Sequence, residues 1–313
     1  MENPLHTLGY KFLSASLHAA PDHESAAAKL TRRGFLLGTA ALSSCAAAGP
    51  LPPRLKPSNP NAAPIKTASN TAYRTPSVHG PVPRNPDVSL GSDFSKSGGI
   101  SFSRVMVSGN YIAITYDDGP HPQNTPRLLD MLRARNIKAT FYVIGQSVNL
   151  YPGIVRRTVA EGHEIGNHSH THRLLSKLSD SDVRLEMSRC RDAVVNAAGV
   201  QPRTMRPPYG GLLQRQREMV HSEFGYPVIL WSADPLDWKR PGAGVITSRI
   251  LAAASSGGIV LAHDLHAQTI DAMPATLDGL LRRGFKFVTV SQLLAMKTDA
   301  PASQVAVAPP SNI

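Results

Sequence analysis

The sequence predicts an α/β fold in which parallel strands alternate with helices and form either a (β/α) barrel or an open, doubly wound sheet. Short apolar runs alternate with helical patterns, which is typical of parallel β–α–β units. Seven strands, each followed by a helix, favour the barrel, complete or incomplete. Polar, chemically reactive residues directly follow several strands, at the edge where the sites of both folds lie.

The predicted strands share a short apolar run: Ile112–Tyr116, Lys138–Ile144, Glu164–Asn167, Thr204–Arg206, Pro227–Trp231, Gly258–Ala262 and Lys286–Val290. The predicted helices share a period near 3.6 residues: Thr125–Arg135, Gly153–Glu161, Asp180–Ala198, Gln214–Glu223, Gly244–Ala254, Ala275–Arg283 and Ser291–Met296. We expect Asn124 to cap the first helix, with Pro126 in its first turn, and Gly162 and Gly199 to close two others. Cys190, on an apolar helix position, is expected to be a core residue.

The first 45 residues have the layout of an export signal. Two arginines precede an apolar stretch of roughly 15 residues, which is shorter than the about 20 needed to span a bilayer. Thr31–Leu36 resembles the twin-arginine motif, and Leu42–Cys45 resembles the bacterial lipobox. We therefore expect residues 1–45 to be a signal segment, Cys45 to be lipidated, and the exported chain to be anchored to a membrane of the cell envelope. A periplasmic or secreted protein without the lipid is the alternative.

Composition separates one globular domain from flanking segments. Residues 46–99 are rich in Pro and Ala and are expected to form a linker, residues 100–298 the domain, and residues 299–313 a disordered tail. The net charge of +11 is compatible with an anionic partner or surface. No interleaving of aromatic with basic residues indicates single-stranded nucleic-acid binding. We expect no nucleic-acid partner, and the sequence leaves the oligomeric state open.

The histidine-rich stretch Asn167–His172 has metal-ligand spacing. His168 and His172 share a face if the segment forms a helical turn, whereas His168 and His170 share one only in a strand. Two imidazoles and a carboxylate, for which Asp118 is the natural candidate, make a three-ligand site with an open position. This arrangement is typical of catalytic zinc, with Co²⁺ or Ni²⁺ as alternatives.

Asp117 and Asp118 stand side by side at the end of a predicted buried strand. Adjacent strand residues point to opposite sides, so we expect one carboxylate to reach the metal and the other to lie beside it. A metal lowers the pKa of its water to about 7, which Asp117 can then deprotonate as a general base. Read alone, two aspartates before Gly-Pro are equally typical of a turn.

Three further strand ends carry polar groups. The prolines after Arg206 make a rigid loop, in which Arg206 can hold a carboxylate through a bidentate pair and the N–H of Tyr209 can stabilise an oxyanion. Asp237 is placed to orient a histidine, and Trp238 to wall an apolar pocket. His263 is a candidate general acid. Each feature alone also fits a structural turn or core residue.

Together, the motifs DDGP, HSxxH, RPPY, DxxDW and LxH, in this order over about residues 110–297, resemble those of the NodB-homology polysaccharide deacetylases, carbohydrate esterase family 4. The resemblance implies a distorted (β/α)7–8 barrel. It implies these roles: Asp117 as base, His263 as acid supported by Asp237, the metal ligands Asp118, His168 and His172, Arg206 beside the base, Tyr209 at the oxyanion, and Trp238 and Leu261 lining the acetate pocket. Tyr116 stands where the family usually has Phe, and His121 and His170 have no assigned role.

The resemblance also implies a reaction: hydrolysis of the N-acetyl group of a β-1,4-linked aminosugar, releasing acetate. A lipid-anchored envelope protein has peptidoglycan within reach, so we expect N-acetylglucosamine in peptidoglycan to be the substrate. Chitooligosaccharide, another exopolysaccharide or acetylxylan remain alternatives, as does a non-catalytic glycan-binding lipoprotein. A phosphodiesterase would want a two-metal carboxylate cluster, which the sequence does not show.

Overall fold

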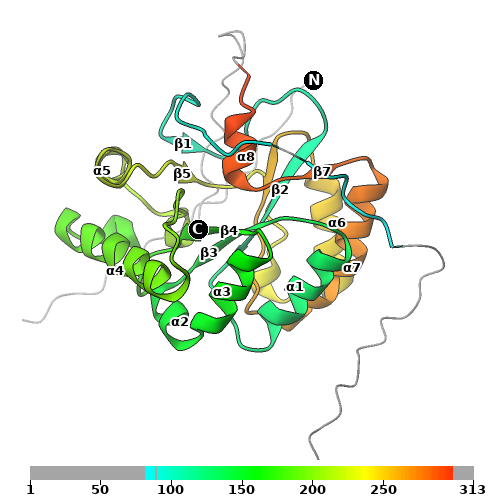
Figure 1. Cartoon of the computed structure of the whole chain (residues 1–313), viewed down its shortest axis with the longest axis horizontal. Helices are drawn as coiled ribbons and strands as arrows, with labels where there is room; N and C mark the ends of the chain where they lie inside the picture. Colours follow the sequence, from blue (N-terminus) through cyan, green and yellow to red (C-terminus); the bar gives the residue numbers. More distant parts are fainter. Residues whose placement is uncertain (1–81, 89, 299–313) are drawn as a thin grey trace, which may run out of the picture. The chain divides into compact units, whose positions relative to one another are not determined.

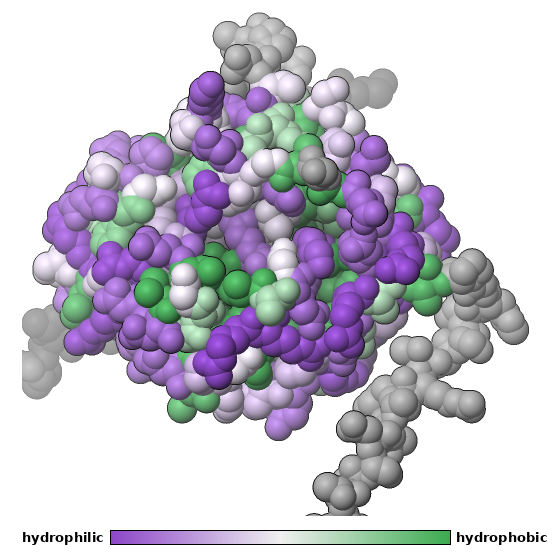
Figure 2. Space-filling view, viewed as in Figure 1, coloured by the Kyte–Doolittle hydropathy of each residue, from purple (hydrophilic) through white to green (hydrophobic). Residues whose placement is uncertain are grey.

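The computed structural model describes residues 82–88 and 90–298 (Figure 1). The expected signal segment with Cys45, most of the expected linker and the expected tail lie outside these residues. Within the described part of the chain, no helix is long and apolar enough to cross a membrane. Figure 2 shows polar residues over most of the face seen in Figure 1, with apolar residues in separate patches.

The parallel strands pair around a closed circuit. β2 (Tyr111–Asp117) pairs on one side with β3 (Thr140–Val143), which pairs with β4 (Glu164–Asn167), and on the other side with β6 (Gly258–Val260). Single-residue bridges close the ring: Asn167 to Met205, Met205 to Val228, and Ala233 to Val260. The barrel is therefore confirmed over the open sheet.

Two further short strands, β1 (Ser101–Phe102) and β7 (Lys286–Phe287), pair with strands of this ring, and helices surround it. β5 (Val228–Ile229) pairs with β1, and β7 pairs with the start of β2. The α-helices, seen around the strands in Figure 1, are α1 (Asn124–Ala134), α2 (Gly145–Leu150), α3 (Pro152–Ala160), α4 (Asp180–Ala198), α5 (Gln214–Phe224), α6 (Ala243–Ala253), α7 (Ala267–Arg282) and α8 (Val290–Ala295).

The alternation of side chains along β2 divides the core in two. Ile112, Ile114 and Tyr116 are buried in the cluster that also contains the apolar faces of the surrounding helices. Ala113 belongs to a second cluster with residues of β3, β5, β6 and α8. Thr115 and Asp117 continue this second side of the strand. Asp117 is therefore directed into the barrel by the same alternation that buries the apolar side chains.

Local signals explain where several helices begin and end. Gly162 (φ 79°) and Gly199 (φ 70°) both adopt the left-handed conformation that ends a helix, as predicted. The predicted Asn124 cap is wrong, because Asn124 is already helical and the preceding residue is Gln123. Instead, Nδ1 of His121 accepts the N–H groups of Gln123 and Asn124 at 3.3 and 3.2 Å.

Other differences come from tertiary packing. α7 begins at Ala267 rather than at Ala275, with Pro274 inside it. The buried stripe containing Ile270 and Leu277 outweighs the loss of one backbone hydrogen bond at the proline. The predicted strand Thr204–Arg206 forms only two single-residue bridges, both at Met205. The helix α2 was not predicted.

Cys190 lies in the core, as predicted. It is free and fully buried on α4, and its Sγ donates to the carbonyl oxygen of Val143 at 3.3 Å.

Candidate active site

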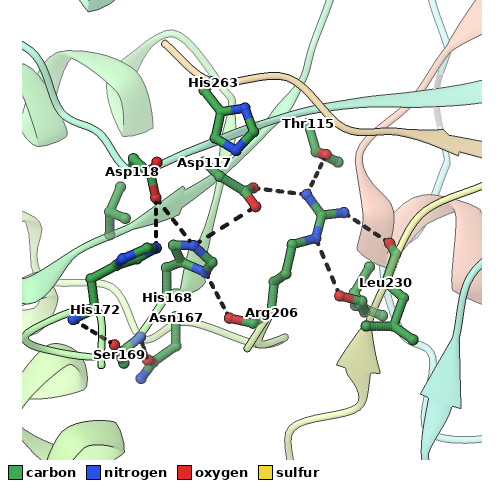
Figure 3. Close-up of polar contacts among 12 residues, drawn as sticks. Thr115, Asp117, Asp118, Asn167, His168, Ser169, His172, Arg206, Leu230 and His263 are labelled. Carbon is green, nitrogen blue, oxygen red and sulfur yellow. Dashed lines mark hydrogen bonds and ion pairs between the residues drawn. The ribbon is translucent and has the colours of Figure 1, made fainter. Parts of the chain in front are cut away.

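The polar residues predicted from the strand ends converge at one edge of the barrel (Figure 3). Asp117 is the last residue of β2, His168 follows β4 directly, and His263 follows β6. The N–H of Asp117 donates to the carbonyl oxygen of Ala262 at 2.9 Å, which holds two of these strand ends together. Figure 3 shows Asp117 between His263 and His168.

Asp117 is buried and held by Arg206. Nη1 of Arg206 donates to Oδ1 of Asp117 at 2.8 Å and to Oγ1 of Thr115 at 2.6 Å. The other guanidinium nitrogens donate to the carbonyl oxygens of Ile229 (3.2 Å) and Leu230 (3.0 Å). The contact with Asp117 is therefore a single hydrogen bond and not the bidentate pair that we predicted. Because Arg206 is fully buried and each of its three guanidinium nitrogens is hydrogen-bonded, its position is fixed by the barrel.

Asp118 does not continue the strand. Its φ of 74° places it in the left-handed region, so the expected alternation of the two aspartates is wrong. Both carboxylates instead face Nε2 of His168, at 3.8 Å from Oδ2 of Asp117 and 3.3 Å from Oδ1 of Asp118.

The histidine pair lies on an irregular loop, not on the helical turn that we predicted. Ser169 (φ 64°) and His172 (φ 60°) are left-handed, a conformation that costs about 1–3 kcal/mol for a residue other than glycine. This path brings the rings of His168 and His172 to 5.0 Å between centroids. Ligand atoms of Asp118, His168 and His172 all lie within 4.8 Å of one another.

The chemistry of this cluster fits a divalent cation. Nδ1 of His168 lies 2.7 Å from the carbonyl oxygen of Arg206, so Nδ1 carries the proton of the neutral ring and donates it there. Nε2 is then left with a lone pair that faces Oδ1 of Asp118, a buried atom that has no hydrogen-bond partner. Electron pairs that face one another are repulsive unless a cation lies between them. Two imidazoles and one carboxylate match the ligands of catalytic zinc.

The charge of Asp118 supports the same interpretation. Burial acts to raise the pKa of this carboxyl, but the His168 and His172 rings, when they are protonated, hold it well below its ordinary value. A cation bound between the same atoms would supply positive charge in place of those protons. Asp118 is therefore ionised at neutral pH and available as a ligand.

His263 and Asp237 form the predicted pair. Nδ1 of His263 lies 2.7 Å from Oδ1 of Asp237, and the N–H of His263 donates to Oδ2 at 2.8 Å. Burial acts to lower the pKa of His263, but the hydrogen bond and charge of Asp237 outweigh it and raise that pKa to about 9. Burial acts in the opposite sense on Asp237, whose pKa is nevertheless lowered by His263. The imidazole is therefore protonated at neutral pH.

The remaining predicted residues lie around this centre. Tyr209 is left-handed (φ 58°), and its ring centroid is 4.9 Å from that of His172. Trp238 is 51% exposed, with Nζ of Lys239 4.8 Å from its ring centroid. Leu261 is buried. The acetate-pocket role of Trp238 and Leu261 stays a prediction.

Several supporting residues were missed from the sequence. Thr115 fixes Arg206, and Oγ1 of Thr269 donates to Oδ2 of Asp237 at 2.7 Å. Asp264 is fully buried, accepts from Oγ1 of Thr125, and has its pKa raised by burial to about 7. Lone threonines carry no recognisable signal, whereas Asp264 stands next to His263 and was readable as a candidate.

Comparison with known proteins agrees with this geometry. The sequence profile of the family described as polysaccharide deacetylase matches residues 105–229. The chain is 44% identical over 186 residues to the peptidoglycan-N-acetylglucosamine deacetylase PgdA of Listeria monocytogenes. The matched region covers 59% of this chain and 39% of that protein. It is 33% identical over 225 residues to a peptidoglycan-N-acetylglucosamine deacetylase of Bacillus cereus, and this match covers 68% of this chain and 81% of that protein. It is also 38% identical over 203 residues to a chitooligosaccharide deacetylase of Bradyrhizobium, and this match covers 60% of this chain and 92% of that protein.

Solved structures show the same fold. The peptidoglycan deacetylase PdaC of Bacillus subtilis is 38% identical with a TM-score of 0.56, and the match covers 59% of this chain and 89% of that one. A CE4 family pseudoenzyme from Bacillus anthracis is 26% identical with a TM-score of 0.60, and the match covers 63% of this chain and 69% of that one. The chain belongs to the polysaccharide deacetylase family. It spans about two fifths of the length of the Listeria relative.

Proposed function

We propose that this protein is a metal-dependent polysaccharide N-deacetylase that hydrolyses N-acetyl groups of β-1,4-linked aminosugars and releases acetate. One observation carries the proposal. A buried carboxylate, Asp117, lies between a three-ligand cluster and a protonated histidine, His263, at the open edge of the barrel (Figure 3). Amide hydrolysis needs a base for the attacking water and an acid for the leaving nitrogen, and these two groups meet that need.

Asp118, His168 and His172 would hold the cation, which we propose to be Zn²⁺. When bound, the cation supplies Lewis acidity to the acetamido carbonyl group and makes water more acidic.

The protein's own groups would move the protons. Asp117, oriented by Arg206, takes a proton from the attacking water through the carboxylate oxygen that Arg206 does not bind. The N–H of Tyr209 stabilises the developing negative charge on the acetamido oxygen. His263, charged at neutral pH because of Asp237, then donates its proton to the nitrogen. Acetate and a free amine leave.

The proposed substrate is N-acetylglucosamine in peptidoglycan. Support comes from the names of the Listeria and Bacillus cereus relatives, and chitooligosaccharide is the second candidate because of the Bradyrhizobium relative. We also propose that the protein is exported to the cell envelope and lipid-anchored at Cys45. Mass spectrometry of the mature N-terminus tests the anchor: an unmodified terminus beyond Cys45 would refute it.

Acetate release from a panel of peptidoglycan, chitin oligomers and acetylxylan tests the function. We expect release from the first two, complete loss after treatment with a chelator, and recovery when Zn²⁺ is added back. Co²⁺ and Ni²⁺ serve as comparison metals. If protein with confirmed bound metal releases no acetate from any glycan, the proposed enzymatic activity is refuted and the non-catalytic alternative is favoured. The pseudoenzyme of Bacillus anthracis is a structurally similar protein of that kind.

A further inference from the structure

A buried carboxylate on α4 is bonded to the loop that carries the two ligand histidines. Oε2 of Glu186 accepts the N–H groups of His170 at 2.8 Å and Thr171 at 2.7 Å. Its Oε1 accepts from Oγ1 of Thr171 at 2.6 Å. Glu186 is only 8% exposed. Among the described residues, no Lys or Arg lies within ion-pair distance of it, so the loop itself compensates this charge.

The same helix also holds the start of the loop. Nδ2 of Asn167 donates to the carbonyl oxygen of Met187, and Oδ1 of Asn167 accepts the N–H of Ser169, both at 2.9 Å. Neighbouring residues of one helix therefore bind the chain before His168 and again just before His172. Both ligand histidines are flanked by bonds that lead to α4.

The path of this loop needs such support. Ser169 and His172 both have a left-handed backbone, a conformation that is unfavourable for residues other than glycine. Between them, the N–H groups of His170 and Thr171 point to the same carboxylate oxygen. Without an acceptor, these N–H groups, on two half-buried residues, would lose their partners and the backbone would have reason to relax. Relaxation would separate the rings of His168 and His172, which now lie 5.0 Å apart.

We infer that Glu186 is a positioning residue that holds the His168–His172 loop in its metal-binding form before the cation arrives. This inference rests on the proposed metal site and adds a residue that touches neither the cation nor the substrate. Groups that orient metal ligands typically change metal affinity by about 10–100-fold when they are removed. Glu186 acts through the backbone on both sides of His170, which explains the position of this otherwise unassigned histidine.

Three variants of the full chain test the inference. Glu186→Ala removes all three hydrogen bonds. Glu186→Gln keeps them, because the amide oxygen can accept both N–H groups while the amide nitrogen donates to Oγ1 of Thr171. Val194→Ala is the matched control: Val194 is fully buried on the same helix, so its truncation destabilises the fold without contacting the loop.

The readouts are the Zn²⁺ dissociation constant, measured by competition with a chromophoric chelator, and amide hydrogen exchange of residues 167–173 in the metal-free chain. We expect Glu186→Ala to raise the dissociation constant about 10–100-fold and to speed exchange in the loop. Glu186→Gln and Val194→Ala should bind Zn²⁺ within a few-fold of the parent, although Val194→Ala lowers the melting temperature.

Three results would overturn the inference: parental affinity in a folded Glu186→Ala chain, equal weakening by Val194→Ala, or a Glu186→Gln chain as weak as Glu186→Ala. Failure of the proposed metal site gives a different result, because the parent chain itself would then bind no Zn²⁺ at the cluster. Failure of the proposed enzymatic activity alone would leave the Zn²⁺ affinities of the parent and the three variants as expected here.

Discussion

The two sides of the site differ in how their charges are compensated. On the acid–base side, Asp117 is bonded to Arg206 at 2.8 Å, and His263 to Asp237 at 2.7 Å. Each charge has an opposite partner from a different strand end. This side is therefore electrostatically complete within the protein, and the barrel itself sets its geometry.

The ligand side is incomplete in the same sense. Oδ1 of Asp118 is buried without a hydrogen-bond partner, and Nε2 of His168, which approaches it at 3.3 Å, has a lone pair of its own in the neutral ring. Its geometry depends on a loop with two left-handed residues, Ser169 and His172. In the proposed mechanism, the barrel would therefore preorganise the two groups that transfer protons, whereas cation binding would depend on a loop that other residues hold in place.

The largest expected effect would separate these two sides directly. Asp117→Asn should lower the rate of acetate release by about 10²–10⁴-fold, because it removes the general base. The zinc content per chain, measured by atomic absorption, should stay at the parental level, since Asp118, His168 and His172 are untouched. Asp118→Asn is the matched variant and should lose zinc. Loss of zinc from Asp117→Asn instead would break the division between the two sides.

A smaller effect concerns the stability of the acid–base side. Arg206→Met should lower the free energy of unfolding by about 3–5 kcal/mol, because it leaves Asp117 buried without its cation. Urea denaturation of the metal-free chain measures this change. Arg184→Met is the control, since Arg184 pairs with Glu223 at the surface and its loss should change stability little. Similar losses in both variants would mean that burial does not strengthen the Asp117 pair.

The smallest effect is a displacement in pH. The folded pKa of His263 is raised from an ordinary value of 6.5 to about 9, so the stabilisation from its pairing with Asp237 is full below pH 6.5 and disappears as the pH rises through 9. Asp237→Asn should move the alkaline limb of kcat/KM toward lower pH. Each unit of displacement lowers the protonated fraction above the pKa about tenfold. Asp271→Asn, at an exposed carboxylate on α7, is the control and should leave the pH dependence of kcat/KM unchanged. If the alkaline limb of Asp237→Asn also stays in place, His263 is not the titrating acid.

Part of this site was predictable because it depends on local patterns. Apolar runs followed by Asp117, His168 and His263 placed these residues at strand ends, and parallel strands bring their ends to one edge whatever the loops do. The pairing of Asp237 with a histidine was also predicted, and the structure confirms it for His263.

Two predictions about the metal-ligand residues failed because they depended on backbone conformation outside regular elements. Asp118 was expected to alternate with Asp117, and His172 to share a helical turn with His168. Both residues are left-handed instead. Asp and His adopt this conformation more often than most residues, but residue type alone does not locate it, because distant contacts stabilise it, such as those from Glu186 to the loop.

By itself, the sequence determined the alternation of strands and helices, the family motifs and the set of residues gathered at the barrel edge. These follow from side-chain period and chain order, which are local properties. Only the tertiary structure decided how Asp118 turns toward the histidines, why Arg206 makes a single bond to Asp117, and which buried groups hold the loop. Those features depend on residues far apart in the chain that compete for the same hydrogen bonds, and no local pattern records the outcome of that competition.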